Sequence, residues 1–204
     1  MSVIEARGLA CSRGDTRLFR DVSFSAGPGE WIAVRGANGS GKTTLLRCVA
    51  GLTRPDTGDV LWDDAPASRH ATFNASTVYA GHAAGIKDEL SATENLRDAL
   101  ALRCASHCAE EIREALDTVG LAKVRNIATR RLSAGQRRRI GLARLALARA
   151  PLWILDEPLT ALDAQGEALF TDLLRGHLGA GGVALIATHH DIGMPSARDV
   201  RLTP

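Results

Sequence analysis

The sequence predicts an α/β fold with a mostly parallel sheet at its centre, and two observations support this prediction. Three short apolar segments, residues 31–35, 153–155 and 183–187, read as strands that are buried on both faces. Helical patterns follow or separate these strands, as at residues 43–50 and 164–177. Strands that alternate with helices are typical of a parallel sheet covered by helices on both faces.

Two regions of the chain depart from this alternation. Residues 1–30 contain short alternating segments separated by glycine turns, which predicts antiparallel strands. Further along, Ser91-x-x-Glu94 has the pattern of a capping box, and apolar residues at helical spacing follow it. We therefore expect a helical subdomain at about 85–130, inserted into a single domain that spans residues 1–204.

Composition and charge exclude several classes of protein. The formal net charge of +2 is too close to balance for a nucleic-acid-binding domain, which needs a clustered basic face. The arginine run at residues 137–139 is short and reads as the solvated start of a helix. No window approaches the roughly 18 consecutive apolar residues of a membrane helix, and the N-terminus lacks a secretory pattern. We expect a chain without a membrane span of its own.

Residues 36–43, Gly-Ala-Asn-Gly-Ser-Gly-Lys-Thr, match the phosphate-loop pattern G-x-x-x-x-G-K-[ST]. The glycines allow backbone N–H groups to turn inward around a phosphate, and the following helix adds its positive end. Lys42 is expected to reach the β- and γ-phosphates, and the Thr43 hydroxyl is a ligand for Mg²⁺. The strand before this loop and the helix after it favour a nucleotide site over a plain glycine-rich turn.

Asp156 and Glu157 supply carboxylate groups, which the phosphate loop lacks. They follow an apolar strand at 152–155, and ligands collect at the carboxyl ends of strands in open α/β sheets. Beside a phosphate loop, Asp156 is expected to hold Mg²⁺ through water. Glu157 is expected to orient or deprotonate the attacking water.

A second anion site is predicted at Ser133 and Gly135. A serine hydroxyl, a glycine amide and a helix N-terminus occur together there, in the segment Leu-Ser-Ala-Gly-Gln at 132–136. One γ-phosphate does not need two helix N-termini from one subunit. The simplest solution is a head-to-tail pair in which this segment closes over the nucleotide of the partner. An ordinary serine N-cap is the alternative.

The phosphate loop, the segment at 132–136 and the acids at 156–157 follow one another along the chain as they do in ABC ATPases, and this resemblance covers nearly the whole chain. Residues 132–136 look like the signature of that family, with Ala134 in place of the commoner first glycine. Residues 161–163, Ala-Leu-Asp, resemble the segment that touches the other subunit. His189 resembles the switch histidine that contacts the γ-phosphate, because it directly follows Thr188.

Two departures narrow the resemblance. Arg13 stands where most ABC ATPases place an aromatic residue to stack on adenine, and its planar guanidinium can also stack. His82 occupies the position of the usual glutamine near Mg²⁺ and the γ-phosphate. The string at 81–96, Gly-His-Ala-Ala-Gly-Ile-Lys-Asp-Glu-Leu-Ser-Ala-Thr-Glu-Asn-Leu, resembles one subfamily, the ATP-binding subunits of bacterial cytochrome c maturation (haem export) systems.

The resemblance implies a P-loop NTPase of ABC type that hydrolyses ATP with Mg²⁺. Glu157, His189 and Lys42 are the expected catalytic residues, and Thr43, Asp156 and His82 are the expected metal ligands. The expected nucleotide contacts are Gly36, Ala37, Asn38, Gly39, Ser40, Gly41, Lys42, Thr43, Thr44, Arg13, His82, Ser133, Gly135 and Asp163.

The same resemblance implies a homodimer that sandwiches two ATP molecules. Its partners would be integral membrane subunits of the cytochrome c maturation complex, at the cytoplasmic face of the bacterial inner membrane. Hydrolysis would power the release of a haem-loaded chaperone. Two alternatives remain open, the ATPase of another small lipid or drug exporter and a soluble ABC ATPase without a membrane partner.

Overall fold

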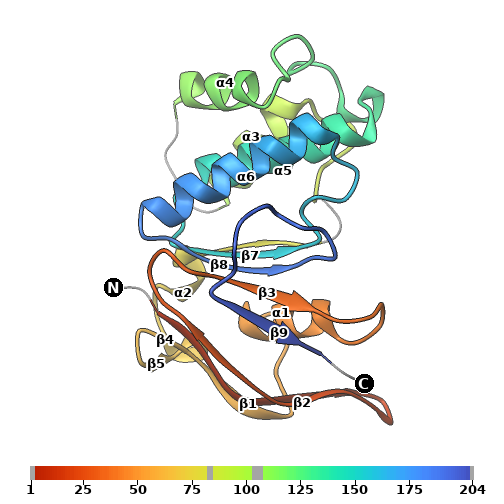
Figure 1. Ribbon diagram of the computed structural model, residues 1–204. Helices are drawn as coiled ribbons and strands as arrows, with labels where there is room; N and C mark the ends of the chain where they lie inside the picture. Colours follow the sequence, from red (N-terminus) through yellow and green to blue (C-terminus); the bar gives the residue numbers. More distant parts are fainter. Residues whose placement is uncertain (1–2, 82–84, 103–107, 203–204) are drawn as a thin grey trace. The chain divides into compact units, whose positions relative to one another are not determined.

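The computed structural model describes residues 3–81, 85–102 and 108–202, and these fall into two compact units (Figure 1). The first unit comprises residues 1–81, 150–158 and 174–204, and the second comprises residues 82–149 and 159–173. No helix in the described ranges is both long enough and apolar enough to cross a membrane.

An antiparallel sheet forms the N-terminal part of the first unit. Its strand order is β2-β1-β4-β5, and a tight turn joins β1 to β2, so that Arg13 pairs with Thr16 (Figure 1). In β1 the buried residues are Ile4 and Ala6, then Leu9 and Cys11 after an irregularity in the pairing, which follows from one face packing on the core. The strands are β1 (Ile4–Arg13), β2 (Thr16–Ala26), β4 (Thr57–Trp62) and β5 (Ala65–Pro66).

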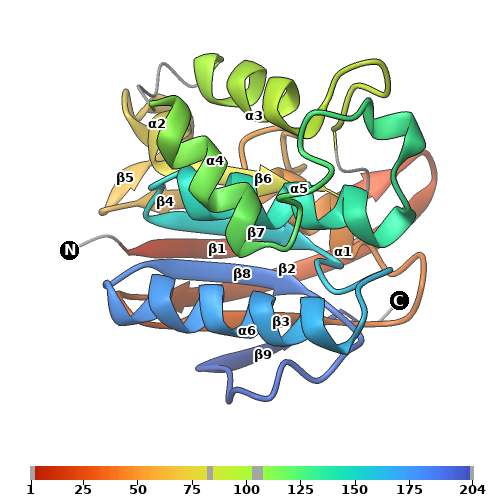
Figure 2. The ribbon, with the colours of Figure 1, turned by 90° about the horizontal axis from the view of Figure 1, so that it is seen from above.

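A parallel sheet forms the rest of the first unit, with strand order β6-β7-β8-β3-β9 (Figure 2). Every residue of β7 and β8 is buried, as expected of central parallel strands. Because all five strands are parallel, their carboxyl ends share one edge of the sheet. The strands are β3 (Trp31–Arg35), β6 (Thr77–Ala80), β7 (Leu152–Asp156), β8 (Val183–Ala187) and β9 (Arg198–Arg201).

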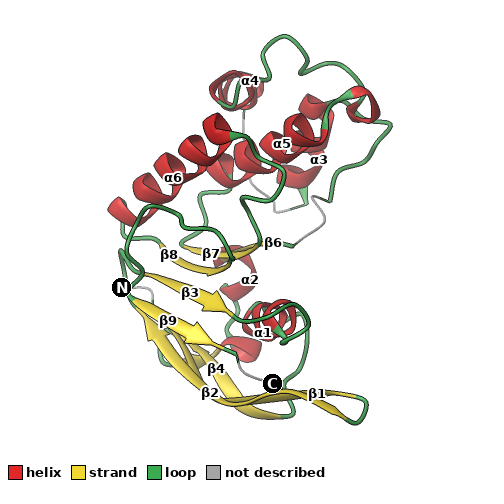
Figure 3. Cartoon of the chain, turned by 45° about the vertical axis from the view of Figure 1, so that its right-hand side comes forward, coloured by secondary structure: helices red, strands yellow, loops and turns green. Residues whose placement is uncertain are grey.

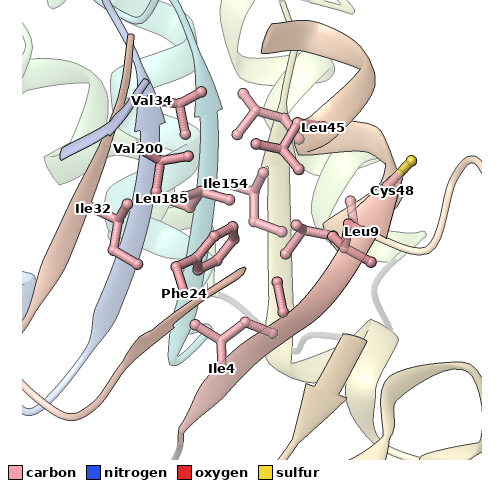
Figure 4. Packing of buried hydrophobic residues seen from close by; sticks show 14 of the residues in the cluster. Ile4, Leu9, Phe24, Ile32, Val34, Leu45, Cys48, Ile154, Leu185 and Val200 are labelled. Atoms are coloured by element: carbon pink, nitrogen blue, oxygen red, sulfur yellow. The ribbon is translucent and has the colours of Figure 1, made fainter. Parts of the chain in front are cut away.

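The core of the first unit joins its two sheets through helix α1 (Lys42–Val49). Leu45 from that helix lies among Ile154 and Leu185 of the parallel sheet and Leu9 of the antiparallel sheet (Figure 4). Burial of these aliphatic side chains is the main source of stability for such a layered unit. Short elements complete it: η1 (Ala67–Arg69) and α2 (Phe73–Ser76).

The second unit is helical (Figure 3). Helices α3, α4 and α5 contact one another, and each begins with a complete capping box. The box at Ser91 and Glu94 confirms the predicted helix start. The elements are α3 (Ala92–Ala101), α4 (Ala109–Thr118), η2 (Thr129–Arg131), α5 (Ala134–Leu147) and α6 (Ala164–Gly179), the last of which contributes residues to both units.

The predicted fold class, an α/β fold with N-terminal antiparallel strands, a parallel core sheet and an inserted helical part, is confirmed. The strands expected at 31–35 and 183–187 have those bounds in the structure. One detail was wrong: the arginines at 137–139 are half-buried rather than solvated, since the Arg139 guanidinium binds Asp163.

Candidate nucleotide site

The phosphate loop connects the end of β3 to the start of α1, and its backbone requires glycine. Gly39 and Gly41 have φ angles of 83° and 94°, which side-chain-bearing residues rarely adopt. At Gly36 a β-carbon would lie 2.5 Å from Ser40 Oγ and 2.8 Å from the Leu202 carbonyl oxygen. The loop can therefore keep its N–H groups close to a ligand only with these residues.

Lys42, the first residue of α1, is buried and uses all three of its ammonium hydrogens. It donates to the carbonyl oxygens of Gly36 (2.8 Å) and Ala37 (3.2 Å), and its Nζ lies 2.9 Å from His189 Nε2. An ammonium group has no acceptor, so this contact requires His189 to accept at Nε2. Among the described residues, the partners of the Lys42 Nζ are thus two carbonyl oxygens of the loop and one imidazole nitrogen.

Thr43 and Asp156 bring two oxygen ligands together at the shared edge of the sheet. The Thr43 hydroxyl donates to Asp156 Oδ2 at 2.7 Å, and the Asp156 side chain is buried at the end of β7. The pKa of the half-buried Tyr79 is raised by burial and, to a lesser extent, by the negative charge of Asp156. A hydroxyl and a carboxylate are the hard oxygen donors that Mg²⁺ prefers.

Glu157 and His189 lie next to this oxygen pair. Glu157 has a φ of 51°, an uncommon backbone angle for a residue other than glycine, and its N–H donates to the Ala187 carbonyl oxygen at 2.8 Å. Its Oε1 lies 3.5 Å from His189 Nε2. The left-handed turn at Glu157 therefore directs a carboxylate out of the buried strand and toward the histidine.

Ser133 and Gly135 lie at the start of α5, in the second unit. The Ser133 hydroxyl accepts from the Gln136 N–H (3.1 Å), and the Gln136 side chain accepts from the Ser133 N–H (2.9 Å). Ser133 is thus a helix N-cap, the plainer of the two predicted alternatives, and the capping box does not use its hydroxyl hydrogen. A β-carbon at Gly135 would lie 3.4 Å from the Ala161 carbonyl oxygen.

Asp163 is held by Arg139 within the second unit. One guanidinium nitrogen, Nη2, donates to both carboxylate oxygens (2.8 and 3.0 Å), and Asp163 Oδ1 also accepts from the Gly166 N–H at 2.9 Å. The hydrogen bond from Arg139, followed by that from Gly166, lowers the pKa of Asp163. Sequence reasoning missed this ion pair, because nothing in the arginine run distinguishes Arg139 from its neighbours.

The structure thus brings the predicted catalytic residues Lys42, Glu157 and His189 together in the first unit, and it keeps Ser133 and Gly135 in the second. Arg13 is exposed at the end of β1 and pairs with Thr16 across the turn. His82, for which a role near Mg²⁺ and the γ-phosphate was predicted, lies outside the described residues. The roles assigned to all of these residues stay predictions.

Comparison with known proteins agrees with this geometry. The family model described as ABC transporter matches residues 19–160. The chain is 49% identical to the cytochrome c biogenesis ATP-binding export protein CcmA of Methylococcus capsulatus, over 91% of this chain and 90% of that protein. It is 41% identical to the protein of the same name from Escherichia coli K12, over 100% of this chain and 97% of that protein.

Solved structures share the fold at lower identity. A putative ABC transporter ATP-binding protein from Pyrococcus furiosus has a TM-score of 0.85 at 22% identity, covering 98% of this chain and 97% of that one. The dimeric structure of a post-hydrolysis state of an ATP-binding cassette, bound to ADP and Pi, has a TM-score of 0.85 at 21% identity. It covers 98% of this chain and 94% of that chain.

Proposed function

The chain belongs to the ABC transporter family as an ATP-binding, ATP-hydrolysing subunit, and from this premise we propose which residues hydrolyse ATP and which complex they drive. The observation that carries the proposal is the cluster of Lys42, Thr43, Asp156, Glu157 and His189 at one edge of the parallel sheet.

The phosphate loop fits a triphosphate. The Ser40 hydroxyl is buried without a hydrogen-bond partner among the described residues, which is a costly state that a bound oxyanion relieves. Lys42 exchanges its three neutral acceptors for the β- and γ-phosphate oxygens, while the N–H groups of residues 36–44 surround the β-phosphate. Arg13 and His82 are proposed to contact the adenine and the γ-phosphate end, respectively.

Thr43, Asp156 and, by proposal, His82 would hold Mg²⁺, which when bound neutralises charge on the β- and γ-phosphate oxygens. Glu157 orients the attacking water and accepts its proton as the water oxygen bonds to the γ-phosphorus. The bond from that phosphorus to the bridging oxygen breaks, and ADP and phosphate leave. His189 donates a hydrogen bond to a γ-phosphate oxygen, so it stabilises the negative charge that develops there.

We further propose that the active form is a homodimer. Each nucleotide lies between residues 36–44 of one subunit and Ser133, Gly135 and Asp163 of the other. Two features support this proposal: the free hydrogen of the Ser133 hydroxyl, and the similarity to a dimeric cassette solved with ADP and Pi. Closure would exclude water from the γ-phosphate, and hydrolysis would release the contacts that hold the subunits together.

The driven partners are proposed to be membrane subunits of the cytochrome c maturation system, at the cytoplasmic face of the bacterial inner membrane. The names of the relatives at 41–49% identity support this choice. In that setting, hydrolysis would release a haem-loaded chaperone through the membrane subunits. The ATPase of another small exporter is the second candidate.

A Glu157→Gln variant tests both parts of the proposal. It should bind ATP normally and hydrolyse it about 10²–10⁴ times more slowly, since it lacks the general base. With ATP and Mg²⁺ it should then capture membrane subunits of cytochrome c maturation from solubilised inner membranes. The matched control is Lys42→Ala/Glu157→Gln, which should capture little.

The outcomes separate the two parts. Turnover by Glu157→Gln at the wild-type rate would contradict the catalytic assignment. Capture of an unrelated permease would leave the ATPase assignment intact and overturn the partner.

A further inference from the structure

A pocket of about 370 Å³ lies between β2 and the end of β9, in the first unit, and none of its lining residues belongs to the phosphate loop. Its apolar lining comes from Leu18, Phe19 and Val22 of β2 and from Leu202, which follows β9. Phe19 and Leu202 are buried, while Leu18 and Val22 are half-buried. The volume is within the range of about 300–1,000 Å³ that is typical of ligand-binding pockets.

Both strands that flank the pocket are edge strands. β2 is the outermost strand of the order β2-β1-β4-β5, and β9 is the outermost strand of the order β6-β7-β8-β3-β9. Within the described ranges, no strand pairs with the outer side of either one. An edge strand presents a row of backbone N–H and C=O groups that can pair with another chain.

Three arginines surround this pocket: Arg17 and Arg20 from β2 and Arg201 from β9. All three are exposed, and within the described ranges their guanidinium groups form no hydrogen bond or ion pair, although the backbones of Arg17 and Arg201 pair within their sheets. The pKa of Asp199 is lowered chiefly by the hydrogen bond from Ser196 Oγ (2.7 Å), then by Arg35, whose Nε donates to it at 3.2 Å, and least by the charge of Arg201. Strands β2 and β9 together carry Arg17, Arg20, Arg198 and Arg201 against the carboxylates of Asp21 and Asp199, so that positive charge is in excess along these two edges.

We propose that this pocket binds an extended, acidic segment of a partner protein, which adds as a strand to the outer edge of β2 or β9. Side chains of an extended peptide alternate between two sides. One side would place apolar residues against Leu18 and Leu202, and the other would place carboxylates beside the guanidinium groups. Backbone pairing supplies affinity in this mode of recognition, and the side-chain pockets supply specificity. The proposal does not depend on how the protein hydrolyses ATP.

A nucleotide base is the rival occupant, because two lining residues also contact the phosphate loop. A β-carbon at Gly41 would lie 3.0 Å from Leu18 Cβ, and one at Gly36 would lie 2.8 Å from the Leu202 carbonyl oxygen. The extended peptide fits the observations better, since the pocket lies along two unpaired strand edges and three arginines are more charge than a neutral base needs.

The test uses the full chain and a fluorescein-labelled peptide of alternating valine and glutamate, with binding followed by fluorescence anisotropy. An Arg17→Gln/Arg201→Gln variant should bind the peptide at least about tenfold more weakly, which corresponds to about 1.4 kcal/mol. Arg54→Gln removes an exposed arginine elsewhere in the same unit and should change nothing. A valine–lysine peptide should not bind.

Hydrogen exchange and competition complete the experiment. The bound valine–glutamate peptide should slow amide exchange at 17–22 or 198–202, and saturating ATP should not displace it. Equal binding by wild type and the double variant, no binding by wild type, or protection confined to other segments would each overturn the proposal. Displacement by ATP, together with weaker ATP binding by the double variant, would assign the pocket to the nucleotide instead. The Glu157→Gln assay is independent of all these outcomes.

Discussion

Helix α1 and helix α5 both begin at residues proposed to bind phosphate, but their first turns differ. Helix α1 starts after Gly41, whose backbone has a left-handed conformation, and no side chain caps the helix. Helix α5 starts after Ser133, with a complete capping box formed with Gln136. The first N–H groups of a helix need partners, so a helix without a side-chain cap is prepared for an anion.

The comparison separates two ways of building an anion site. At α1 the fold leaves backbone donors and a buried Lys42 for the ligand, at the cost of a strained glycine loop. At α5 the chain satisfies part of its own helix end, so that the segment is stable before any ligand arrives. Four substitutions test this distinction.

Lys42→Ala should have the largest effect. Loss of a buried charged donor to phosphate should weaken ATP binding roughly 10- to 150-fold and abolish measurable hydrolysis. Titration with a fluorescent ATP analogue and a phosphate-release assay would measure both. Lys123→Ala, which removes an exposed lysine, is the control and should bind and hydrolyse ATP as wild type does. Normal ATP affinity in Lys42→Ala would contradict the inference that the start of α1 is built to bind phosphate.

Gly41→Ala should come next. Its φ of 94° costs a residue with a β-carbon about 1–2 kcal/mol, and the new methyl group would press on Leu18 and Phe19. The free energy of unfolding in urea should fall accordingly, with weaker ATP binding. Gly141→Ala is the matched control, because a β-carbon there meets nothing within 4 Å and the helix α5 should gain about 0.5–1 kcal/mol. Equal unfolding curves for the two variants would contradict the argument.

Ser133→Ala should lower stability by about 1 kcal/mol through loss of the cap. Ser91→Ala removes the equivalent cap of α3 and should cost about the same. Only Ser133→Ala should also slow ATP hydrolysis, with ATP binding to the isolated subunit unchanged. If both variants hydrolyse ATP equally well at matched stability, Ser133 is a cap and nothing more.

Asp163→Asn should have the smallest effect, a small loss of stability at neutral pH that disappears in acid. The lowered pKa of Asp163 means that the unfolded chain binds its proton first as pH falls. Its contribution to stability is complete above the ordinary pKa of about 4 and is lost as pH falls through the folded-state pKa. The free energy of unfolding should therefore fall more steeply below about pH 4 for wild type than for Asp163→Asn.

Arg139→Gln, which removes the partner of Asp163, should flatten the acid limb in the same way. Parallel curves for all three proteins in a urea series from neutral pH to pH 3 would mean that the ion pair is screened by solvent.

The sequence predicted the buried elements better than the exposed ones. Continuous apolar runs marked β3 and β8 with their correct bounds. The edge strand β9 was not predicted, because its residues are Arg-Asp-Val-Arg and only Val200 is buried. The helix whose start was predicted near residues 132–136 ends at Leu147, and Arg149 has a positive φ of 45°.

The candidate site shows the same limit. Local spacing identifies the phosphate loop and the acids after β7, since each pattern is contiguous in the sequence. The contacts of Lys42 with His189 and of Arg139 with Asp163 join residues far apart in the chain. Such contacts depend on how the elements pack, which no local pattern encodes.

The strand pairing has a consequence for the order in which the chain folds. β3 pairs with β8 and β9, so that Val34 lies beside Ala187 and Val200. β9 follows every other strand and helix of the described residues, so a ribosome releases it after them. The helices α3, α4 and α5 start from signals four residues long and make their contacts with near neighbours. Local contacts form early and distant ones late. During synthesis, the helical unit can therefore fold before β3, the strand that leads into the phosphate loop, has paired with β8 and β9.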